Sequence, residues 1–280
     1  WKNKKVLVTG HTGFKGSWLV IWLKILGAKV YGYSLKPSTN PSLYKLSKIE
    51  QIINRSYIKD IRNLKSLKKV INSVKPSIVF HLAAQPSVRY SYNKPIETIE
   101  TNILGSTNLL EISKNNKNIK AIVMIATDKV YKNDEKKISF NENHALGGKD
   151  IYSASKASSE LILNAYIHSF FNDKIIRLAS ARSGNVIGGG DWTKDRIVTD
   201  SISAFSKNKN LIIRYPEAIR PWQHVLEPLY GYILLAQKIY QSEGKKYVGS
   251  WNFGPKTQNN KRVIDLVKKL KKDMKSKSKI

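Results

Sequence analysis

Residues 5–19 read Lys-Val-Leu-Val-Thr-Gly-His-Thr-Gly-Phe-Lys-Gly-Ser-Trp-Leu, and they contain the strongest indication of the fold. The apolar run Lys5–Thr9 predicts a buried β-strand, and a helical pattern follows over Gly13–Leu26. Between them stands a G-x-x-G-x-x-G turn, formed by Gly10, Gly13 and Gly16. Glycines at such a turn let the backbone approach a pyrophosphate, which then sits on the N-terminus of the helix. The stretch therefore predicts a dinucleotide-binding turn.

The alternation of strand and helix continues through the first 180 residues. Runs rich in Val and Ile predict further strands at Lys29–Tyr33, Ile78–Ala83, Ala121–Ala126 and Ile175–Ala179. Helical patterns lie between them at Leu64–Val74, Pro95–Ser113 and Tyr152–Phe171. Strands of this kind alternating with helices predict an α/β fold with a doubly wound parallel sheet of Rossmann type. We expect this sheet to be complete through Ala179.

The pattern changes after residue 180. A glycine-rich loop occupies Ser183–Trp192, and the later elements are short. We therefore expect two domains, a dinucleotide-binding domain over residues 1–180 and a smaller C-terminal substrate lobe over residues 181–280. The lysine-rich end, Lys268–Lys279, has no turn or strand after it and is expected to be solvated or frayed.

Composition excludes several classes of protein. The 280 residues contain no cysteine, which excludes a disulfide, a thiol nucleophile and a Cys-ligated metal, and no metal is expected. No apolar run is long enough to cross a bilayer, and the first residues lack the features of a signal peptide. A cytoplasmic location is the expectation.

The formal charge of +29 is the most unusual bulk property. It fits either a nucleic-acid or membrane-surface binder, or the codon bias of an AT-rich genome. Lysines outnumber arginines by 40 to 9, and the basic residues form no long block before the tail, so we expect neither nucleic acid nor membrane as a partner. The positive field would still attract an anionic substrate.

Two positions bear on the adenosine half of a dinucleotide. The second strand ends Tyr33-Ser34-Leu35-Lys36, without the acidic residue that would bind a ribose, so Lys36 either meets a 2′-phosphate or is simply solvated. Asp60 either caps the next helix or accepts a hydrogen bond from adenine. Farther along, His81–Gln85 ends a strand with small residues, which suits either a close cofactor or simple packing.

Tyr152 and Lys156 stand four residues apart, one turn along the same face of a predicted helix. A nearby ammonium stabilises phenolate, so we expect the pKa of Tyr152 to fall below its usual value of about 10. The pair would then exchange a proton with a hydroxyl substrate while hydride moves to a nicotinamide.

Thr127, Asp128 and Lys129 follow the predicted strand Ala121–Ala126, at the carboxyl end where doubly wound sheets place ligand chemistry. They form either a polar loop with an exposed ion pair or an acid and a base in one pocket with Tyr152. We favour the pocket. A lysine base must be neutral, so its pKa would have to be lowered by burial or by a neighbouring cation.

Seven segments in order give this chain a specific resemblance: Gly10–Leu19, His81–Gln85, Thr127–Tyr131, Tyr152–Lys156, Arg182–Trp192, Asp195–Asp200 and Arg220–Pro228. They resemble the extended short-chain dehydrogenase/reductase family, and within it the 4,6-dehydratases that act on CDP-glucose. Relatives that use dTDP-glucose have glutamate where this chain has Lys129. Members of the family are usually longer, so the resemblance also implies a substrate lobe that is incomplete at its C-terminal end.

The resemblance implies a nucleotide-activated hexose as substrate, with CDP-glucose favoured, and NAD as cofactor. Tyr152, helped by Lys156 and Thr127, would remove the O4 proton as hydride leaves C4. Lys129 would take the C5 proton, and Asp128 would protonate the departing C6 hydroxyl. Returning the hydride to C6 gives a 4-keto-6-deoxy sugar.

The resemblance also assigns binding residues. Those implied for the cofactor are Gly10, Thr12, Gly13, Phe14, Gly16, Asp60, Ile61, Leu82, Ala83, Ala84, Gln85, Thr101, Tyr152 and Lys156. Asn185, Arg196 and Arg220 are implied near the diphosphate or nucleotide, and Arg182 is a further candidate there, because arginine suits bidentate phosphate contacts.

A homodimer or homotetramer is also implied, with the helices Pro95–Ser113 and Tyr152–Phe171 at the interface. Apolar residues there either form that interface or only pack on the sheet: Ile99, Ile103, Leu109, Leu110, Ile162 and Ile167. The alternatives to a dehydratase are an epimerase or reductase of nucleotide sugars, a truncated non-catalytic cofactor-binding protein, and a basic nucleic-acid binder.

Overall fold

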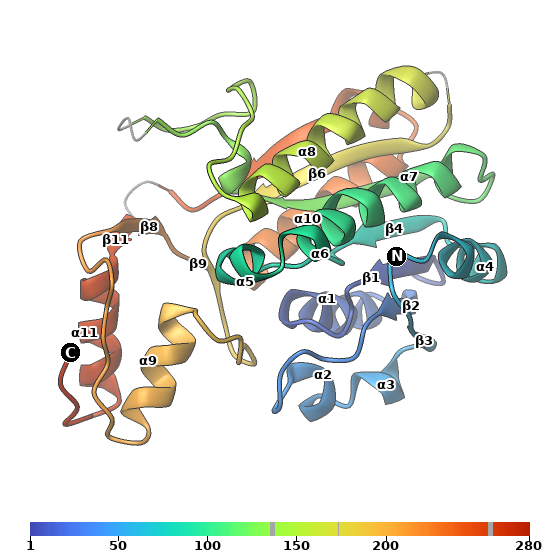
Figure 1. Ribbon diagram of the computed structural model, residues 1–280. Helices are drawn as coiled ribbons and strands as arrows, with labels where there is room; N and C mark the ends of the chain where they lie inside the picture. The colour runs from blue at the N-terminus through green and yellow to red at the C-terminus, as the bar shows by residue number, and fades with distance from the viewer. Residues whose placement is uncertain (135–137, 173, 257–259) are drawn as a thin grey trace.

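A parallel sheet of seven strands lies at the centre of the computed structural model, which describes residues 1–134, 138–172, 174–256 and 260–280 (Figure 1). The strand order is β10-β6-β5-β4-β1-β2-β3, and every neighbouring pair is parallel. The strands are β1 Lys5–Thr9, β2 Lys29–Ser34, β3 Arg55–Ile58, β4 Ile78–His81, β5 Ala121–Thr127, β6 Arg177–Ser183 and β10 Gly249–Phe253. The predicted doubly wound Rossmann-type sheet is confirmed.

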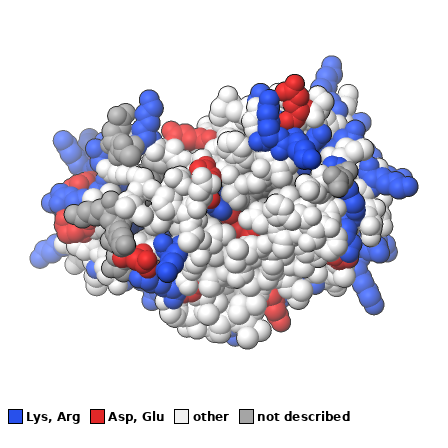
Figure 2. Space-filling model, turned by 90° about the horizontal axis from the view of Figure 1, so that it is seen from above, with Lys and Arg blue, Asp and Glu red and all other residues white. Residues whose placement is uncertain are grey.

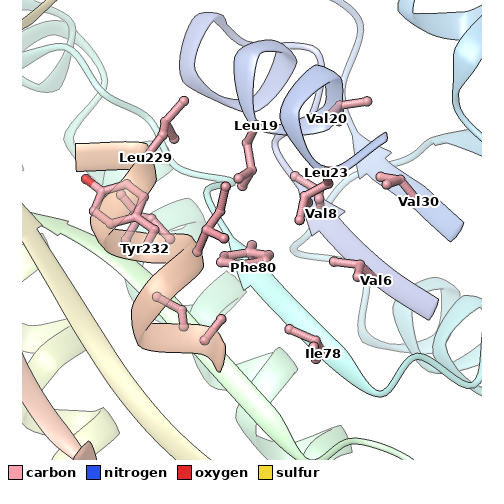
Figure 3. Close-up of a cluster of buried hydrophobic side chains, with 14 of the residues drawn as sticks. Val6, Val8, Leu19, Val20, Leu23, Val30, Ile78, Phe80, Leu229 and Tyr232 are labelled. Atoms are coloured by element: carbon pink, nitrogen blue, oxygen red, sulfur yellow. The ribbon is translucent and has the colours of Figure 1, made fainter. Parts of the chain in front are cut away.

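Helices cover both faces of this sheet and create two separate cores. On one face α1 and α10 pack over the central strands, where Leu19, Leu23, Leu229 and Tyr232 meet Phe80 of β4 (Figure 3). On the other face α4, α7 and α8 bury a second apolar cluster. The main-layer helices are α1 Phe14–Ile25, α4 Leu64–Val74, α7 Gly105–Lys114, α8 Ile151–Tyr166 and α10 Leu226–Tyr240. Strands such as β5, in which all seven residues are buried, are apolar on both sides because they lie between these layers.

Shorter elements complete the main layers: α2 Leu43–Leu46, α3 Ile49–Ile52, α5 Val88–Asn93, α6 Pro95–Ile99 and the 3-10 turns η2 Asp128–Val130 and η4 Gly244–Tyr247. The predicted helix Pro95–Ser113 is observed as α6 and α7 joined by a π-helical segment, η1 Glu100–Leu104. The predicted Tyr152–Phe171 is observed as α8 continued by a second π segment, η3 Ile167–Phe171. Among the described residues, no helix combines the length and apolarity needed to span a bilayer.

The sheet is not complete at Ala179, contrary to the expectation from sequence. Its edge strand β10 comes from the C-terminal third of the chain and pairs with β6 from Gly249 opposite Ala179 to Phe253 opposite Ser183. The sixth strand also begins later than predicted, because pairing with β5 places Arg177 opposite Ala121 and leaves Ile175 outside, 70% exposed. The Rossmann unit thus draws on residues from both sides of the expected boundary at residue 180.

A small lobe lies beside the carboxyl ends of the strands (Figure 1). It contains α9 Ile197–Phe205, α11 Val263–Asp273 and two short two-stranded pairings, β7 Val186–Ile187 with β9 Gln223–His224 and β8 Ile219–Pro221 with β11 Asn260–Arg262. Phe205, Leu211, Val263 and Val267 form its own core.

The expectation of a frayed end was wrong. Residues 263–273 are helical, Ser278 is 2% exposed, and the Lys279 carbonyl accepts a hydrogen bond from the Leu211 amide at 3.0 Å. The basic tail packs on the lobe because its apolar positions fill that core, while its lysines face solvent.

Candidate active site

The glycine turn between β1 and α1 is formed by close backbone contacts. A side chain at Gly10 would place its Cβ 2.7 Å from the Ala83 nitrogen, and Gly10 has a φ of +73°. A Cβ at Gly16 would lie 2.1 Å from the Gly10 carbonyl oxygen. These two glycines are therefore required by the turn itself, which crosses from β1 over the end of β4.

Gly13 differs, because its neighbours within the chain do not require a glycine. A Cβ there would meet only the Gly10 oxygen, at 3.4 Å, which is ordinary contact, and Gly13 is exposed at the N-terminus of α1. In the described part of the chain no side chain caps this helix, and its first turn has no acidic residue. Open space above uncapped N–H groups fits the pyrophosphate of a dinucleotide.

The candidates Thr12 and Phe14 lie directly before and after Gly13. Thr12 Oγ1 donates to the Leu35 carbonyl at 2.8 Å and lies 2.9 Å from Ser34 Oγ, which ties the turn to the end of β2. Phe14 packs against the main core, near Gly188 of the glycine-rich loop. Lys36 is exposed beyond the end of β2, so it is accessible to solvent and to a ligand alike.

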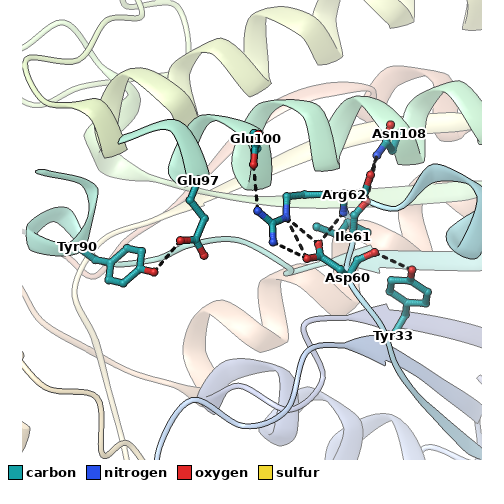
Figure 4. A network of polar contacts seen from close by, with 8 residues as sticks. All are labelled: Tyr33, Asp60, Ile61, Arg62, Tyr90, Glu97, Glu100 and Asn108. Carbon is teal, nitrogen blue, oxygen red and sulfur yellow. Dashed lines mark hydrogen bonds and ion pairs between the residues drawn. The ribbon is translucent and has the colours of Figure 1, made fainter. Parts of the chain in front are cut away.

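Asp60 is engaged by Arg62, in a network that Figure 4 shows from close by. The Asp60 carboxylate accepts from the Arg62 backbone N–H at 2.9 Å and from the guanidinium at 2.6 Å, and Arg62 lowers the pKa of this carboxyl. Asp60 does not cap the next helix as one alternative had it, since Asn63 does so through Ser66. The side chain of Ile61 is 4% exposed in the second core, so any contact of Ile61 with a cofactor would involve its main chain.

The segment after β4 lies directly beside the glycine turn. The Ala83 N–H donates to Thr9 Oγ1 at 3.2 Å, and Leu82 N–H donates to the Thr9 carbonyl at 3.1 Å. Asn102 holds both main-chain groups of Gln85, at 2.8 and 3.2 Å, and reaches Ser155 of α8 at 2.9 Å. Thr101 lies in the same π segment as Asn102, and such segments occur often at functional sites. The structure therefore places the Leu82–Gln85 segment beside the glycine turn and links it through Asn102 to α8.

The Tyr152–Lys156 pair lies on α8 against the end of β5. Lys156 is 8% exposed and donates to the Ile125 carbonyl at 2.8 Å. Burial lowers its pKa to about 8, opposed by the carboxylate of Glu160. The expected fall in the Tyr152 pKa is not observed: burial raises it to about 12, although a hydrogen bond with Thr127 acts in the opposite direction. The desolvation of the phenol outweighs the stabilisation of phenolate that the spacing suggested.

Thr127, Asp128 and Lys129 form the turn η2 at the carboxyl end of β5. Thr127 Oγ1 donates to Asp128 Oδ1 at 3.1 Å and accepts from the Lys129 backbone N–H at 3.4 Å. Gly184 makes room for Asp128, because a Cβ at Gly184 would lie 2.8 Å from Asp128 Oδ2. Lys129 is exposed, so the burial expected for a lysine base is not observed in the structure.

Lys15 is a functional candidate that sequence reasoning missed. It projects from the glycine turn and donates to Ser183 Oγ at 3.5 Å, at the end of the strand beside β5. Burial lowers its pKa to about 7, and the nearby cations Arg196 and Lys156 lower it further, while Asp128 raises it. A lysine between Gly13 and Gly16 was the available signal, since it directs an amine toward the same sheet end as Tyr152.

The substrate candidates lie in the lobe that faces this sheet end. Arg196 pairs with Asp191 at 3.3 Å and is 38% exposed, while Arg220 is exposed and its guanidinium donates to the Ile219 carbonyl at 2.8 Å. The Asn185 carbonyl accepts from the Gln223 N–H at 3.1 Å, which joins the two loops. Arg182 is excluded as a phosphate ligand, because it is 2% exposed and its guanidinium binds Glu160. Arg182 lies on β6, which pairs with β5 on one side and β10 on the other, and its side chain contacts Glu160 of α8.

A parallel sheet with an open glycine turn after β1 and a tyrosine–lysine pair against the end of β5, with β4 between them, defines a Rossmann-type fold of the short-chain dehydrogenase/reductase class. The family model for GDP-mannose 4,6 dehydratase matches residues 7–280, and the chain belongs to this family.

Three relatives place the chain within that class. It is 50% identical over 275 residues to the CDP-glucose 4,6-dehydratase of Salmonella typhimurium, an alignment that spans 96% of this chain and 76% of that protein. The fold superimposes with a TM-score of 0.84 on the UDP-glucose 4-epimerase of Thermotoga maritima solved with UDP-glucose, at 25% identity over 98% of this chain and 84% of that one. It superimposes with a TM-score of 0.81 on the dTDP-glucose 4,6-dehydratase of Bacillus anthracis in complex with NAD, at 23% identity over 98% and 82% of the two chains.

Proposed function

We propose that the protein is an NAD-dependent nucleotide-sugar 4,6-dehydratase, a carbon–oxygen lyase that converts CDP-glucose to CDP-4-keto-6-deoxyglucose. The observation that carries the proposal is the Asp128–Lys129 turn beside Tyr152. An acid and a base next to the oxidising pair are needed for elimination and not for simple oxidation or epimerisation. The 50% identity to a CDP-glucose 4,6-dehydratase supports the choice of substrate.

Each residue has a defined task in this mechanism. Tyr152 receives the O4 proton of glucose in its phenolate form, and the Lys156 ammonium and the hydrogen bond with Thr127 stabilise that phenolate before the transfer. Bound NAD would supply the hydride acceptor for C4 and the donor for C6. Lys129 removes the proton at C5, which the new ketone acidifies, and Asp128 delivers a proton to the C6 hydroxyl as it leaves. We expect the bound sugar to cover the exposed Lys129 side chain.

The nucleotide end of the substrate would meet Asn185, Arg196 and Arg220. The free faces of the two guanidiniums suit a diphosphate, because arginine forms two parallel hydrogen bonds to phosphate oxygens. Asp191 forms an ion pair with Arg196, and the positive charge of Arg196 acts to lower the pKa of both Lys15 and Tyr152.

The direct test is product formation from a panel of nucleotide hexoses. The protein is incubated with CDP-, dTDP-, GDP- or UDP-glucose, with and without added NAD, and then treated with alkali to develop the ultraviolet absorbance of a 4-keto-6-deoxy sugar. We expect absorbance with CDP-glucose above all others. A 4-epimer without this absorbance would favour the epimerase that the fold similarity to the Thermotoga maritima enzyme suggests. Binding of NAD without any turnover would favour a non-catalytic cofactor-binding protein.

The choice of NAD over NADP is tested separately, because β2 ends without the acidic residue that favours NAD. A dehydratase recycles its hydride internally and has no need of the NADP pool, so we expect tighter binding of NAD. Tighter binding of NADP that disappears in Lys36→Ala would overturn this choice.

We also propose that two copies associate through the helical layer of α5, α6 and α8. In the view from above in Figure 2, the middle of the molecule shows few Lys and Arg side chains, although the formal net charge of the chain is +29. Leu109, Leu110 and Ile167 cannot contribute, since they are buried in the second core. The exposed apolar side chains available here are Tyr92, Ile96, Ile99, Leu104 and Leu161.

A further inference from the structure

A buried ion pair lies behind the candidate active site. Arg182 of β6 and Glu160 of α8 have side chains only 2% and 3% exposed. Arg182 Nε lies 2.9 Å from both carboxylate oxygens of Glu160, and Ser250 of β10 donates to the same carboxylate at 3.1 Å. Burying two charges is costly, and apolar residues of the same size often stabilise a fold as well or better. Stability alone is therefore a weak reason for this pair.

The pair extends to the catalytic turn through Tyr131. Arg182 Nη1 donates to the Tyr131 hydroxyl at 2.7 Å, and its guanidinium lies 4.9 Å from the ring centroid. The same hydroxyl donates to Asn252 Oδ1 at 2.6 Å, and the ring stacks on Phe140 at a centroid distance of 5.0 Å. Tyr131 is 4% exposed, and its buried hydroxyl is held by one hydrogen bond that it donates and one that it accepts.

The chain positions of these residues connect the two halves of the proposed chemistry. Tyr131 follows Lys129 by two residues and ends the turn η2. Glu160 follows Lys156 by four residues and therefore lies on the same face of α8, one turn farther along. Arg182 joins them from β6, between the strand that leads into the turn and the edge strand β10.

We propose that Glu160, Arg182 and Tyr131 are positioning residues that hold the Asp128–Lys129 turn in register with the Tyr152–Lys156 helix. This inference rests on the function proposed above. The elimination needs the acid and the base at C6 and C5 of the same sugar whose O4 faces Tyr152, so the two segments must keep a fixed separation. A link through buried, hydrogen-bonded charges resists displacement more than apolar contact does, because any shift leaves a buried polar group unpaired. Glu160 also raises the pKa of Lys156 against burial, which favours the ammonium form beside Tyr152.

The test uses Tyr131→Phe, which removes one hydroxyl and keeps both the ring stack and the ion pair. Arg182→Met is avoided because an unpaired buried Glu160 is expected to unfold the chain. The matched control is Tyr166→Phe, which removes a hydroxyl that binds Glu111 at 3.0 Å on the outer part of α8. In a single turnover of CDP-glucose labelled at C4, NADH absorbance reports oxidation, and the 4-keto-6-deoxy product reports elimination.

We expect Tyr131→Phe to slow elimination by about 10- to 100-fold, because small misplacements of catalytic groups have effects of this size. Oxidation and CDP-glucose binding should change far less, so that NADH accumulates, while Tyr166→Phe behaves as the wild type. Equal slowing of both steps, or no change in either, would overturn the assignment.

A second measurement is independent of activity. Amide hydrogen exchange over residues 127–132 should be faster in Tyr131→Phe than in the wild type and in Tyr166→Phe, while exchange over residues 152–156 is retained. Unchanged exchange over residues 127–132 would reject the positioning role even for a chain with normal turnover. If the wild type does not turn over CDP-glucose, the proposed function fails, and the exchange measurement alone decides whether the network holds the turn.

Discussion

Alanine should be harmful for different reasons at Gly16, in the first turn of α1, and at Gly13, which precedes that helix. In Gly16→Ala the new Cβ would lie 2.1 Å from the Gly10 oxygen and 2.9 Å from the His11 Cα, and both atoms are backbone that cannot rotate away. Overpacking of this kind costs about 1–3 kcal/mol. For a chain of this size each kcal/mol lowers Tm by roughly 2–4 °C. Gly16→Ala should therefore melt at a clearly lower temperature even without ligand.

Gly13→Ala should instead keep its stability and lose the cofactor. Its Cβ would make one ordinary contact of 3.4 Å, and its φ of −78° suits alanine. The loss in stability from alanine at this helix start should not exceed about 1 kcal/mol. The methyl group would, however, occupy the space where we place the pyrophosphate. The assay is thermal unfolding with calorimetric titration of NAD, and Gly189→Ala is the control because no atom of the described residues lies within 4 Å of its Cβ. Equal Tm values for Gly16→Ala and Gly189→Ala, or wild-type NAD affinity in Gly13→Ala, would refute the reasoning.

Three further predictions concern chemistry, pH and assembly. Asp128→Asn and Lys129→Ala should each slow elimination by roughly 10²–10⁴-fold with less effect on oxidation, whereas Tyr152→Phe should block both steps. Single-turnover traces of NADH and product measure the two steps separately. Unchanged elimination in both Asp128→Asn and Lys129→Ala would leave an epimerase or reductase as the better assignment. Because burial lowers the pKa of Lys15 from 10.5 to about 7, folding releases its proton between these values, and the penalty of the buried ammonium is complete only below about pH 7. Lys15→Met should thus raise Tm most at pH 6 and progressively less toward pH 10, and a gain independent of pH would contradict the shift. Leu161 is an exposed apolar residue of α8, and Leu161→Lys should convert the dimer to a monomer, as measured by light scattering. A wild-type chain that is monomeric at micromolar concentration would count against the interface.

The parts of the fold that sequence predicted are those set by local pattern. The strand Lys5–Thr9 has its predicted bounds, because the buried residues Val6, Leu7 and Val8 are all apolar and a glycine turn follows Thr9. β10 was missed because its sequence, Gly-Ser-Trp-Asn-Phe, is polar or aromatic and only partly buried at the sheet edge. Its place in the sheet depends on pairing with β6, which no local pattern reveals.

The candidate site divides in the same way. Spacing on one helix identified Tyr152 and Lys156, and the position of Thr127 and Asp128 followed from the strand before them. The environment of each group could not be read from spacing, since the pKa of Tyr152 depends on how deeply the fold buries it. Arg182 is an example: an arginine in a motif of the substrate lobe suggested a phosphate ligand. Only the folded structure shows that its partner is Glu160.

The late origin of β10 has a consequence for synthesis on the ribosome. The first six strands emerge well before Gly249, so a growing chain holds β6 with one row of main-chain N–H and C=O groups unpaired. Such an open edge attracts the strands of other chains, and domains generally begin to fold before translation ends. The interval is the time needed to translate residues 184–248, which build most of the small lobe and α10. The net charge of +29 opposes such pairing during this interval, because like-charged chains repel one another.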